Sequence, residues 1–531
     1  MRLISRFLSF AVCAILPILA GAKDYRTIRN DAFKLTVAGK PIYSQGGGIF
    51  RFTDPRDGVE KYFWYGVHYK EAELYAANPV QKYARNTFVG ISLYTSTDLT
   101  SWTEETEVMT VDDLLKDSGR RFAGWVGRMG VAYIEETGDY GLYVQHNNSV
   151  LVARSDSPLG PFKPYRHIDM TSRIGTPNTG DQTVFTDPDT GKSYLVYSYG
   201  KGRHKTYISE LGIESQTDSL GLKNCEMVFS GAGREGNCMF KRGGRYYIYA
   251  SNLYGWDSSY AYYLVADNIY GPYRPAGTEM AVTPGCEKDY AHISQTGFFY
   301  TLRAGDRETV IYCGDRWTDF AHNGLGYNQW VPMEFDSDGT PNFVSLSEWQ
   351  LDHATGDWRV GHGNNYVLNG SFDADRRIIP LANKPRQEFL LGWDTEVLRG
   401  NKVGVGLPDS PQLNRENSPE DNAHVTGKLA LNISDNVAFE RRVSQLVEDS
   451  RYIPLKDGKY ILSATVKVSG SFSRLELFGG KDAKDLKGLG SDWQRVSVPV
   501  TVKGGSIRVG IYAKGSAGAS CCVDDITLVS K

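Results

Sequence analysis

The segment GDQTVFTDPDTGKSYLVYSYG, residues 180–200, decides the fold. It opens on a carboxylate, Asp181, which a short apolar run follows. A DPDTG turn and a tyrosine-rich run come next. Aromatic and β-branched residues on both sides of a glycine-containing turn are typical of two antiparallel strands joined as a hairpin. The segment therefore predicts a β-hairpin whose first strand begins at a charged side chain.

The same unit recurs four more times between residues 40 and 340. The other copies are QGGGIFRFTDPRDGVEKYFWYGVHY (45–69), GRMGVAYIEETGDYGLYVQHNN (127–148), REGNCMFKRGGRYYIYASN (234–252) and SQTGFFYTLRAGDRETVIYCGDRW (294–317). Further strand-like runs follow most copies. Five repeats of three or four short antiparallel strands predict an all-β fold built on a five-bladed β-propeller. We expect residues 34–37 to supply the missing strand of the last blade.

A polar residue opens each of the five copies. In a propeller the first strand of each blade lines the central channel, so the five openers are predicted to share one pocket. They are Gln45, Arg128, Asp181, Glu235 and Gln295. Any single opener has an alternative role, which is to satisfy backbone groups at a strand end. Asp181 and Glu235 together favour a catalytic site.

Two of the copies resemble catalytic segments of a known family. DQTVFTDPDTGKSYLVYS and REGNCMFKRGGRYYIYAS resemble the two carboxylate-bearing segments of glycoside hydrolase family 43. The phrases QGGGI, YGVH, ARSDSPLGPF, SQTGFF, GDRW and YNQWVPMEF are similar to its exo-β-1,3-galactanase branch, and the resemblance covers roughly residues 40–336. It implies a five-bladed propeller that cleaves arabinose-, xylose- or galactose-containing glycans with inversion.

The resemblance also implies roles for three residues. Glu235 is the general acid, and it must stay protonated near neutral pH to protonate the leaving oxygen. Burial and the like charge of Asp181 are expected to raise its pKa, while Asp181 stays ionised. Gln295 is expected to position the attacking water, about 6.5–9.5 Å from the acid across the sugar.

The chain departs from the family at two other positions of the predicted site. Most members have an aspartate base where Gln45 stands, and the galactanase branch has a glutamate where Gly127 precedes Arg128. The galactose preference is therefore open. The alternatives are an α-L-arabinofuranosidase or β-xylosidase of the same family, a non-catalytic glycan-binding propeller, and a polysaccharide lyase that uses His146 with Arg128.

Further side chains are predicted to bind the substrate. His68 and His146 end tyrosine-rich strands, and the GDRW phrase and two aromatic residues add candidates. The predicted substrate-binding residues are Gln45, His68, Arg128, His146, Trp256, Asp315, Arg316, Trp317 and Tyr327. A structural role is an alternative for the histidines and aromatics. His292 is predicted to be a neutral histidine bonded to water in the channel.

The domain plan follows from changes along the chain. Residues 1–22 have a basic start, an apolar run and an A-x-A site, and predict a cleaved signal peptide with a secreted or periplasmic location. Residues 23–345 are assigned to the propeller, 346–364 to a linker, and 365–531 to a β-sandwich (jelly roll). The last resembles carbohydrate-binding modules of families 4 and 9, in which Asp373 and Asp525 are candidate ligands of a structural Ca²⁺. A sandwich that only braces the propeller is the alternative.

Composition limits the partners. The chain has 531 residues and a formal net charge of −3, without the basic excess of a nucleic-acid-binding protein. The sequence predicts a polysaccharide or oligosaccharide substrate, no cofactor for catalysis, no nucleic acid or membrane partner, and a monomer. The cysteines after the signal peptide have no metal-binding spacing, and most are expected to be buried as small hydrophobic side chains, with no bond between the adjacent Cys521 and Cys522.

Overall fold

The computed structural model describes residues 23–77, 87–119, 123–255, 257–317, 326–374, 390–401, 414–416 and 429–531. The predicted signal peptide lies outside these residues. Strands dominate the described chain, and the all-β prediction is confirmed. The described helices are the short elements α1 (Lys70–Ala77), α2 (Val111–Ser118), α3 (Thr171–Ile174) and α4 (Tyr290–Ile293). None of the described helices is long and apolar enough to cross a membrane.

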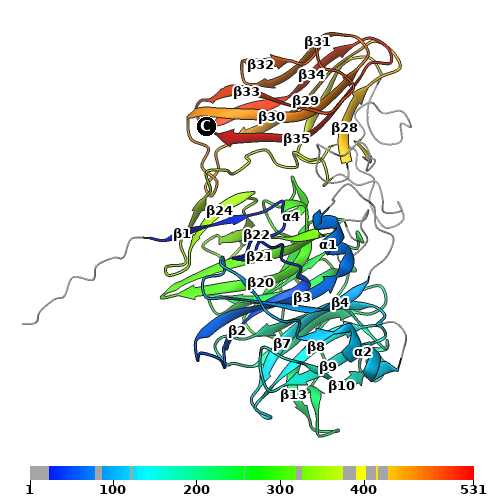
Figure 1. Ribbon diagram of the computed structural model, residues 1–531, viewed down its shortest axis with the longest axis vertical. Helices are drawn as coiled ribbons and strands as arrows, with labels where there is room; N and C mark the ends of the chain where they lie inside the picture. Colours follow the sequence, from blue (N-terminus) through cyan, green and yellow to red (C-terminus); the bar gives the residue numbers. More distant parts are fainter. Residues whose placement is uncertain are drawn as a thin grey trace, which may run out of the picture.

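Five antiparallel sheets follow one another along the described part of residues 45–343, one for each copy of the repeat (Figure 1). Sheet 1 contains β2 (Gln45–Thr53), β3 (Glu60–Tyr69), β4 (Phe88–Ser96), β5 (Thr103–Glu104) and β6 (Met109–Thr110). Sheet 2 contains β7 (Val126–Ile134), β8 (Asp139–His146), β9 (Ser149–Ser155) and β10 (Lys163–Ile168). Sheet 3 contains β11 (Thr179–Thr186), β12 (Ser193–Tyr199), β13 (Lys205–Glu214), β14 (Ser219–Leu222) and β15 (Glu226–Ser230).

Sheets 4 and 5 complete this body. Sheet 4 contains β16 (Glu235–Arg242), β17 (Arg245–Ser251), β18 (Ala261–Ala266) and β19 (Ala281–Val282). Sheet 5 contains β20 (Gln295–Ala304), β21 (Arg307–Trp317), β22 (Gly326–Phe335) and β23 (Pro341–Phe343). The first strands contact one another in the closed order β2, β7, β11, β16, β20 and back to β2. This order is the one that the predicted propeller requires.

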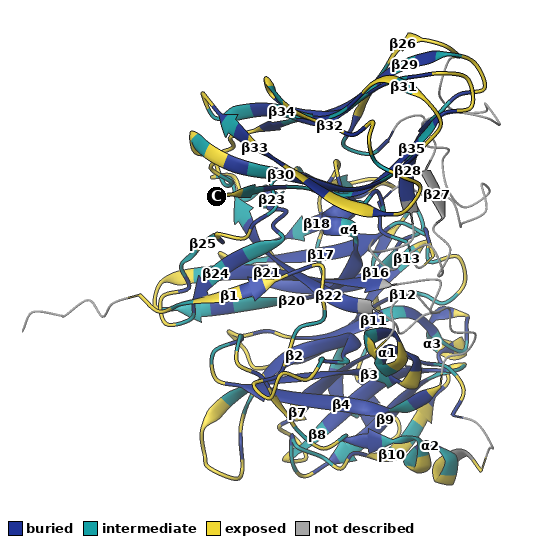
Figure 2. Cartoon of the chain, turned by 45° about the horizontal axis from the view of Figure 1, so that its top comes forward, coloured by how far each residue is buried: buried dark blue, intermediate teal, exposed yellow. Residues whose placement is uncertain are grey.

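Hydrophobic clusters between neighbouring sheets hold the ring together. The last of them joins sheet 5 to sheet 1 and contains Trp64, Trp330 and Trp349. Figure 2 shows the strands of the five sheets as largely buried, with exposed residues at the turns. The strand predicted at residues 34–37 is absent from sheet 5 of the described chain, whose fourth strand is β23. Residues 35 and 36 make only isolated bridges, to Pro41 and Trp102.

The predicted linker, residues 346–364, is part of the folded body. It forms β24 (Glu348–Asp352) and β25 (Trp358–Val360), which pair with β1 (Tyr25–Arg29) near the N-terminus. Trp349 and Leu351 are 0% exposed. Only Gln350 lies between them, and so short an alternation among polar residues does not stand out in the sequence, so the linker prediction was wrong.

Residues after 390 form two five-stranded sheets that share one core. The first is ordered β26 (Asp394–Arg399), β29 (Phe439–Glu448), β34 (Ser506–Gly515), β31 (Phe472–Gly479) and β32 (Asp482–Asp485). The second is ordered β27 (Asn414–Glu416), β28 (Leu429–Ser434), β35 (Ser520–Ser530), β30 (Gly458–Ser469) and β33 (Gln494–Val502). We call them the C-terminal sheet pair. In Figure 1 the pair lies at the end of the five-sheet body that carries β24 and α4.

The six described cysteines are unpaired, and all except the half-buried Cys225 are buried. This agrees with the expectation from their spacing.

Candidate functional site

A register shift near the start of each first strand places the openers. The shift lies between Gln45 and Gly48 in β2, and at corresponding places in β7, β11, β16 and β20. Such bulges break the regular alternation of side chains and redirect them. Gly236, directly after Glu235, has φ +65°, and a Cβ there would lie 2.4 Å from the Thr296 carbonyl oxygen. Only glycine allows this bend beside sheet 5.

The redirected side chains meet at one cavity of about 260 Å³. We call it the axial cavity. Arg128, Asp181, Glu235 and Gln295, four of the five predicted openers, line it. The fifth, Gln45, is buried beside it, and the neighbouring Gly46 forms the wall instead.

Glu235 is held as an acid. Gln295 Nε2 donates to Glu235 Oε1 at 2.8 Å, and Arg203 Nε lies 3.8 Å from Glu235 Oε2. Burial, and then the negative charge of Asp181, raise the pKa of Glu235 from 4.5 to about 8. The side chain is therefore mainly protonated at neutral pH.

The surroundings of Asp181 keep its carboxyl group ionised. Burial opposes its ionisation, but the charges of Arg203 and Arg128 and the backbone N–H of Gly236 outweigh it and lower the pKa of Asp181. The Gly236 N–H donates to Asp181 Oδ2 at 2.8 Å, and Arg128 Nε lies 3.6 Å from the same oxygen. The two carboxyl groups of the cavity thus have pKa values that their surroundings push apart, which is the pattern of an acid with a charged partner.

Arg128 links two residues around the cavity through its guanidinium group. Its Nη1 donates to Asp315 Oδ2 at 2.7 Å and its Nη2 to Gln295 Oε1 at 2.9 Å. Asp315 is 0% exposed and also accepts from Asn328 Nδ2 at 2.8 Å. Burial raises the pKa of Asp315 despite Arg128. Asp315 was predicted to bind substrate, but it lies behind Arg128 and positions that guanidinium.

Two predicted histidines face away from the axial cavity. His68 Nδ1 pairs with Glu107 at 2.8 Å, and the wall contains its neighbours Val67 and Tyr69. His146 Nε2 contacts the Ala123 carbonyl oxygen at 2.8 Å, and Gln145 reaches the cavity instead. Successive side chains of a strand point to opposite faces, so a prediction that is off by one residue picks the wrong face.

Arg316 and Tyr327 line a second cavity of about 510 Å³ between the five-sheet body and the C-terminal sheet pair. Arg316 Nη2 lies 2.6 Å from Asp373 Oδ2 and its Nη1 lies 3.2 Å from Asp31 Oδ1. Arg316 follows Asp315 in β21 and so points the other way. The prediction that Arg316 and Tyr327 belong to the sugar site was wrong, because this cavity is separate from the carboxyl pair.

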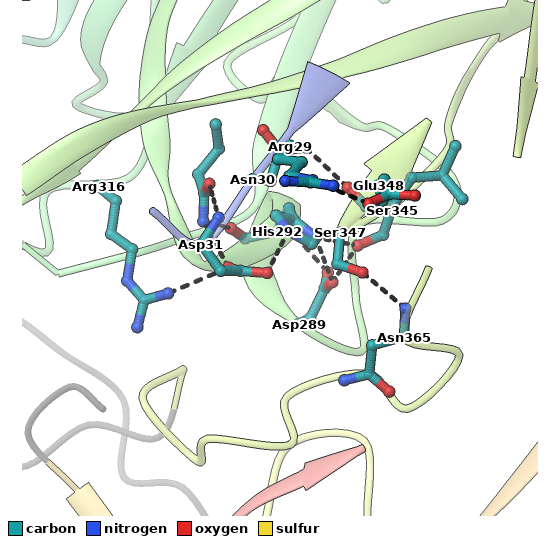
Figure 3. Close-up of polar contacts among 12 residues, drawn as sticks. Arg29, Asn30, Asp31, Asp289, His292, Arg316, Ser345, Ser347, Glu348 and Asn365 are labelled. Carbon is teal, nitrogen blue, oxygen red and sulfur yellow. Dashed lines mark hydrogen bonds and ion pairs between the residues drawn. The ribbon is translucent and has the colours of Figure 1, made fainter. Parts of the chain in front are cut away.

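His292 belongs to the same network, which Figure 3 shows. Its Nε2 lies 3.2 Å from Asp31 Oδ2 and its Nδ1 lies 2.7 Å from Ser345 Oγ. Burial opposes protonation, but the charge of Asp31 outweighs it and raises the pKa of His292. His292 therefore lies in this network and does not line the axial cavity, and its neutral, water-bonded state stays a prediction.

Two predicted aromatic platforms cannot be placed. Trp256 lies outside the described residues, and Trp317 ends β21 but its side chain is not described. Both stay predictions.

The structure adds two residues that the sequence did not single out. Arg203 reaches the axial cavity from the turn between β12 and β13, and Gln145 reaches it from the end of β8. An arginine in a glycine-rich turn gives no signal in the sequence. Gln145 was one position from a predicted residue.

The predicted Ca²⁺ ligands are Asp373 and Asp525. Among the described residues no group of three or more His, Cys, Asp or Glu side chains could hold a metal ion. Asp373 pairs with Arg316, and Asp525 is a separate part of the lining of the second cavity. The two aspartates do not form a ligand set, so calcium stays a prediction.

The cavity holds a protonated carboxyl group beside an ionised one, which is a pair of groups that hydrolysis of a glycosidic bond can use. The model of the glycosyl hydrolases family 43 matches residues 67–341, more than half of the chain, and the protein belongs to this family. The resemblance seen in the sequence is confirmed at this level, and the protein is a glycoside hydrolase.

Solved structures show the same fold along nearly the whole chain. An exo-β-1,3-galactanase from Phanerochaete chrysosporium with β-1,3-galactotriose is 19% identical, with a TM-score of 0.53, and the match covers 94% of this chain and 99% of that one. An exo-β-1,3-galactanase from Clostridium thermocellum is 19% identical, with a TM-score of 0.51 and coverage of 95% and 100%. A search of curated proteins gave no match.

Proposed function

We propose that the protein is an inverting exo-glycosidase whose substrate is β-1,3-galactan or the arabinogalactan that contains it. One observation carries the proposal: Glu235 and Asp181 lie in one cavity, the first with a pKa of about 8 and the second with a lowered pKa. In this proposal the five sheets are the blades of a propeller. The similarity to two exo-β-1,3-galactanases supports the sugar and the linkage.

The protonated Glu235 donates its proton to the leaving glycosidic oxygen. Asp181 keeps the acid protonated until then, because a second negative charge beside Asp181 is unfavourable. After the transfer, Arg203 stabilises the carboxylate that forms, and the Gln295 amide bonds to it again once the sugar has left. The cavity of about 260 Å³ supports an exo mode, in which one terminal sugar enters.

Inversion is supported by the absence of a nucleophile. Asp181 and Glu235 are the only carboxylates among the described residues that line the cavity. Asp181 is engaged by Arg128, Arg203 and the Gly236 N–H, which suits a charge partner rather than a nucleophile. A single displacement by water is therefore the mechanism that we propose. The water oxygen bonds to the anomeric carbon as the bond to the leaving oxygen breaks, Glu235 protonates that leaving oxygen, and the water releases its extra proton to solvent, from which Glu235 is protonated again.

The expected separation between acid and water-positioning group is not present. Gln295 contacts Glu235 at 2.8 Å, whereas about 6.5–9.5 Å was expected across a sugar. With no sugar between them the two side chains bond to each other. In the proposed mechanism this contact opens when the substrate enters, and the Gln295 carbonyl, anchored to Arg128, then faces the water.

The lyase alternative is disfavoured by His146. Its ring contacts the Ala123 carbonyl oxygen and does not line the cavity with Arg128. A lyase would lack its base there.

Product analysis tests the proposal. The purified protein is incubated with β-1,3-galactotriose, arabinogalactan, and aryl α-L-arabinofuranosides and β-xylosides. We expect free galactose, first formed as the α-anomer in proton NMR. Release of arabinose or xylose instead would favour the alternative glycosidases, and a first-formed β-galactose would refute inversion.

We extend the proposal to the setting of the enzyme. Export by the predicted signal peptide would bring the protein into contact with polysaccharide. We propose that it acts as a monomer and needs no cofactor for catalysis. The C-terminal sheet pair is proposed to be a β-sandwich that binds glycan or braces the propeller.

A further inference from the structure

Gln145 carries an unused acceptor in the wall of the axial cavity. It precedes His146, the last residue of β8, and the side chain lines the cavity and is 5% exposed. Its Oε1 has no hydrogen-bond partner within the described chain. Buried amide oxygens in native proteins are nearly always bonded, so an unbonded one at the wall of a cavity indicates a partner that arrives with the ligand.

Gly127 provides the space that this amide occupies. A Cβ at residue 127 would lie 2.6 Å from Gln145 Oε1 and 2.9 Å from Trp125 Nε1. Gly127 does not have a positive φ, so the backbone conformation does not demand glycine. We therefore attribute the glycine at position 127 to the space that the Gln145 amide needs.

The amide is also compatible with the charge of the site. A carboxylate at this wall would add a negative charge to the cavity of Glu235 and raise the pKa of the acid further. An amide oxygen accepts a hydrogen bond without that effect.

We propose that Gln145 Oε1 accepts a hydrogen bond from one hydroxyl group of the terminal sugar, and that Gly127 keeps the place for this amide. Gln145 is then a specificity-determining residue of the glycosidase. The inference rests on the proposed function, because it requires a sugar in the axial cavity. It names a contact that distinguishes sugars by the presence and direction of one hydroxyl.

A deoxy-sugar series isolates this contact. Wild type, Gln145→Ala and Gly127→Ala are assayed on an aryl β-galactoside and on its 2-, 3-, 4- and 6-deoxy analogues. Because one hydrogen bond to a sugar hydroxyl is lost, Gln145→Ala is expected to lower kcat/KM on the parent about 10- to 100-fold. On the analogue that lacks the partner hydroxyl, wild type is already reduced and Gln145→Ala is reduced no further.

Gly127→Ala should produce the same pattern, because the new methyl group displaces the amide. The double variant should lose no more than either single one, since both remove the same contact. Asn148→Ala, at an exposed position of the turn after β8, is the matched control and should be unchanged on every sugar. Gln145→Glu keeps an acceptor, so it should retain the discrimination while the alkaline limb of its pH profile moves to higher pH.

The outcomes separate the two proposals. Equal losses for Gln145→Ala on the parent and on all four analogues, in an enzyme that cleaves β-galactosides, would refute the role of Gln145 alone. A wild-type protein inactive on β-galactosides would refute the proposed substrate, and this inference would fall with it. If Gln145→Ala does not fold, Gln145→Glu and Gly127→Ala decide by the same comparison.

Discussion

Replacing Asp181 by asparagine should move the alkaline limb of the pH–rate profile to lower pH. The rise in the pKa of Glu235 from 4.5 to about 8 corresponds to about 5 kcal/mol in favour of the protonated form. Burial is the larger cause and the charge of Asp181 the second. The Glu235 side chain is only 12% exposed, so solvent screens this interaction weakly.

The size of the effect follows from the second cause. Both carboxylates lie 3.8 Å from nitrogens of the same Arg203 guanidinium. At an effective dielectric constant of about 20, two charges on the order of 5–10 Å apart interact with about 2–3 kcal/mol. Removing the charge of Asp181 makes it easier for Glu235 to lose its proton. We therefore expect the pKa of Glu235 to fall, and the alkaline limb to move about one to two pH units toward acid.

The assay is kcat/KM for galactose release from β-1,3-galactotriose between pH 4 and pH 10. The poor leaving group makes the reaction depend on the general acid. Arg203→Met is the matched control of opposite sign, since Arg203 lies 3.8 Å from Glu235 and lowers its pKa. The alkaline limb of the Arg203→Met profile should move to higher pH. A limb that stays in place in Asp181→Asn would show that the two carboxyl groups are not coupled.

The remaining predictions concern the acid, the domains and their contact. Glu235→Gln should keep the thermal midpoint and lose at least about a hundredfold in rate on galactotriose, and activity near wild type would exclude Glu235 as the acid. Residues 23–364 should fold without the C-terminal sheet pair, because Trp349 and Leu351 complete the body, whereas a piece ending at 345 should be less stable in urea; equal midpoints would contradict this. Arg316→Ala should destabilise the whole chain by about 3–5 kcal/mol, since Asp373 and Asp31 lose a buried partner, and a change below about 1 kcal/mol would show that the ion pair is dispensable.

The repeat in the sequence was sufficient to predict the sheets and the residues that open them. Each copy combines a polar opener, a turn and a tyrosine-rich strand, and the periodicity of such units does not depend on distant contacts. Arg128, Asp181, Glu235 and Gln295 meet because each starts the same strand of its own sheet.

Side-chain direction could not be predicted in the same way. His68, His146 and Arg316 each lie one residue from a side chain that points toward the axis, and the repeat does not show which of two neighbouring positions on a strand faces inward. Arg203 comes from a turn whose conformation depends on what it packs against. The N-terminal strand β1 recruits residues 348–352 across more than 300 positions, which no local pattern reveals.

The amide of Gln295 explains how an acid with so high a pKa can still release its proton. Burial and Asp181 favour the protonated form of Glu235, while Arg203, Arg128 and the hydrogen bond from Gln295 favour the ionised form. Arg128 accounts for the direction of this bond, because it donates to Gln295 Oε1 and leaves Nε2 to face Glu235. A carboxylate at position 295 would add a third negative charge beside the acid and raise its pKa further. Burial and Asp181 therefore keep Glu235 protonated near neutral pH, while the amide at position 295 favours release of the proton.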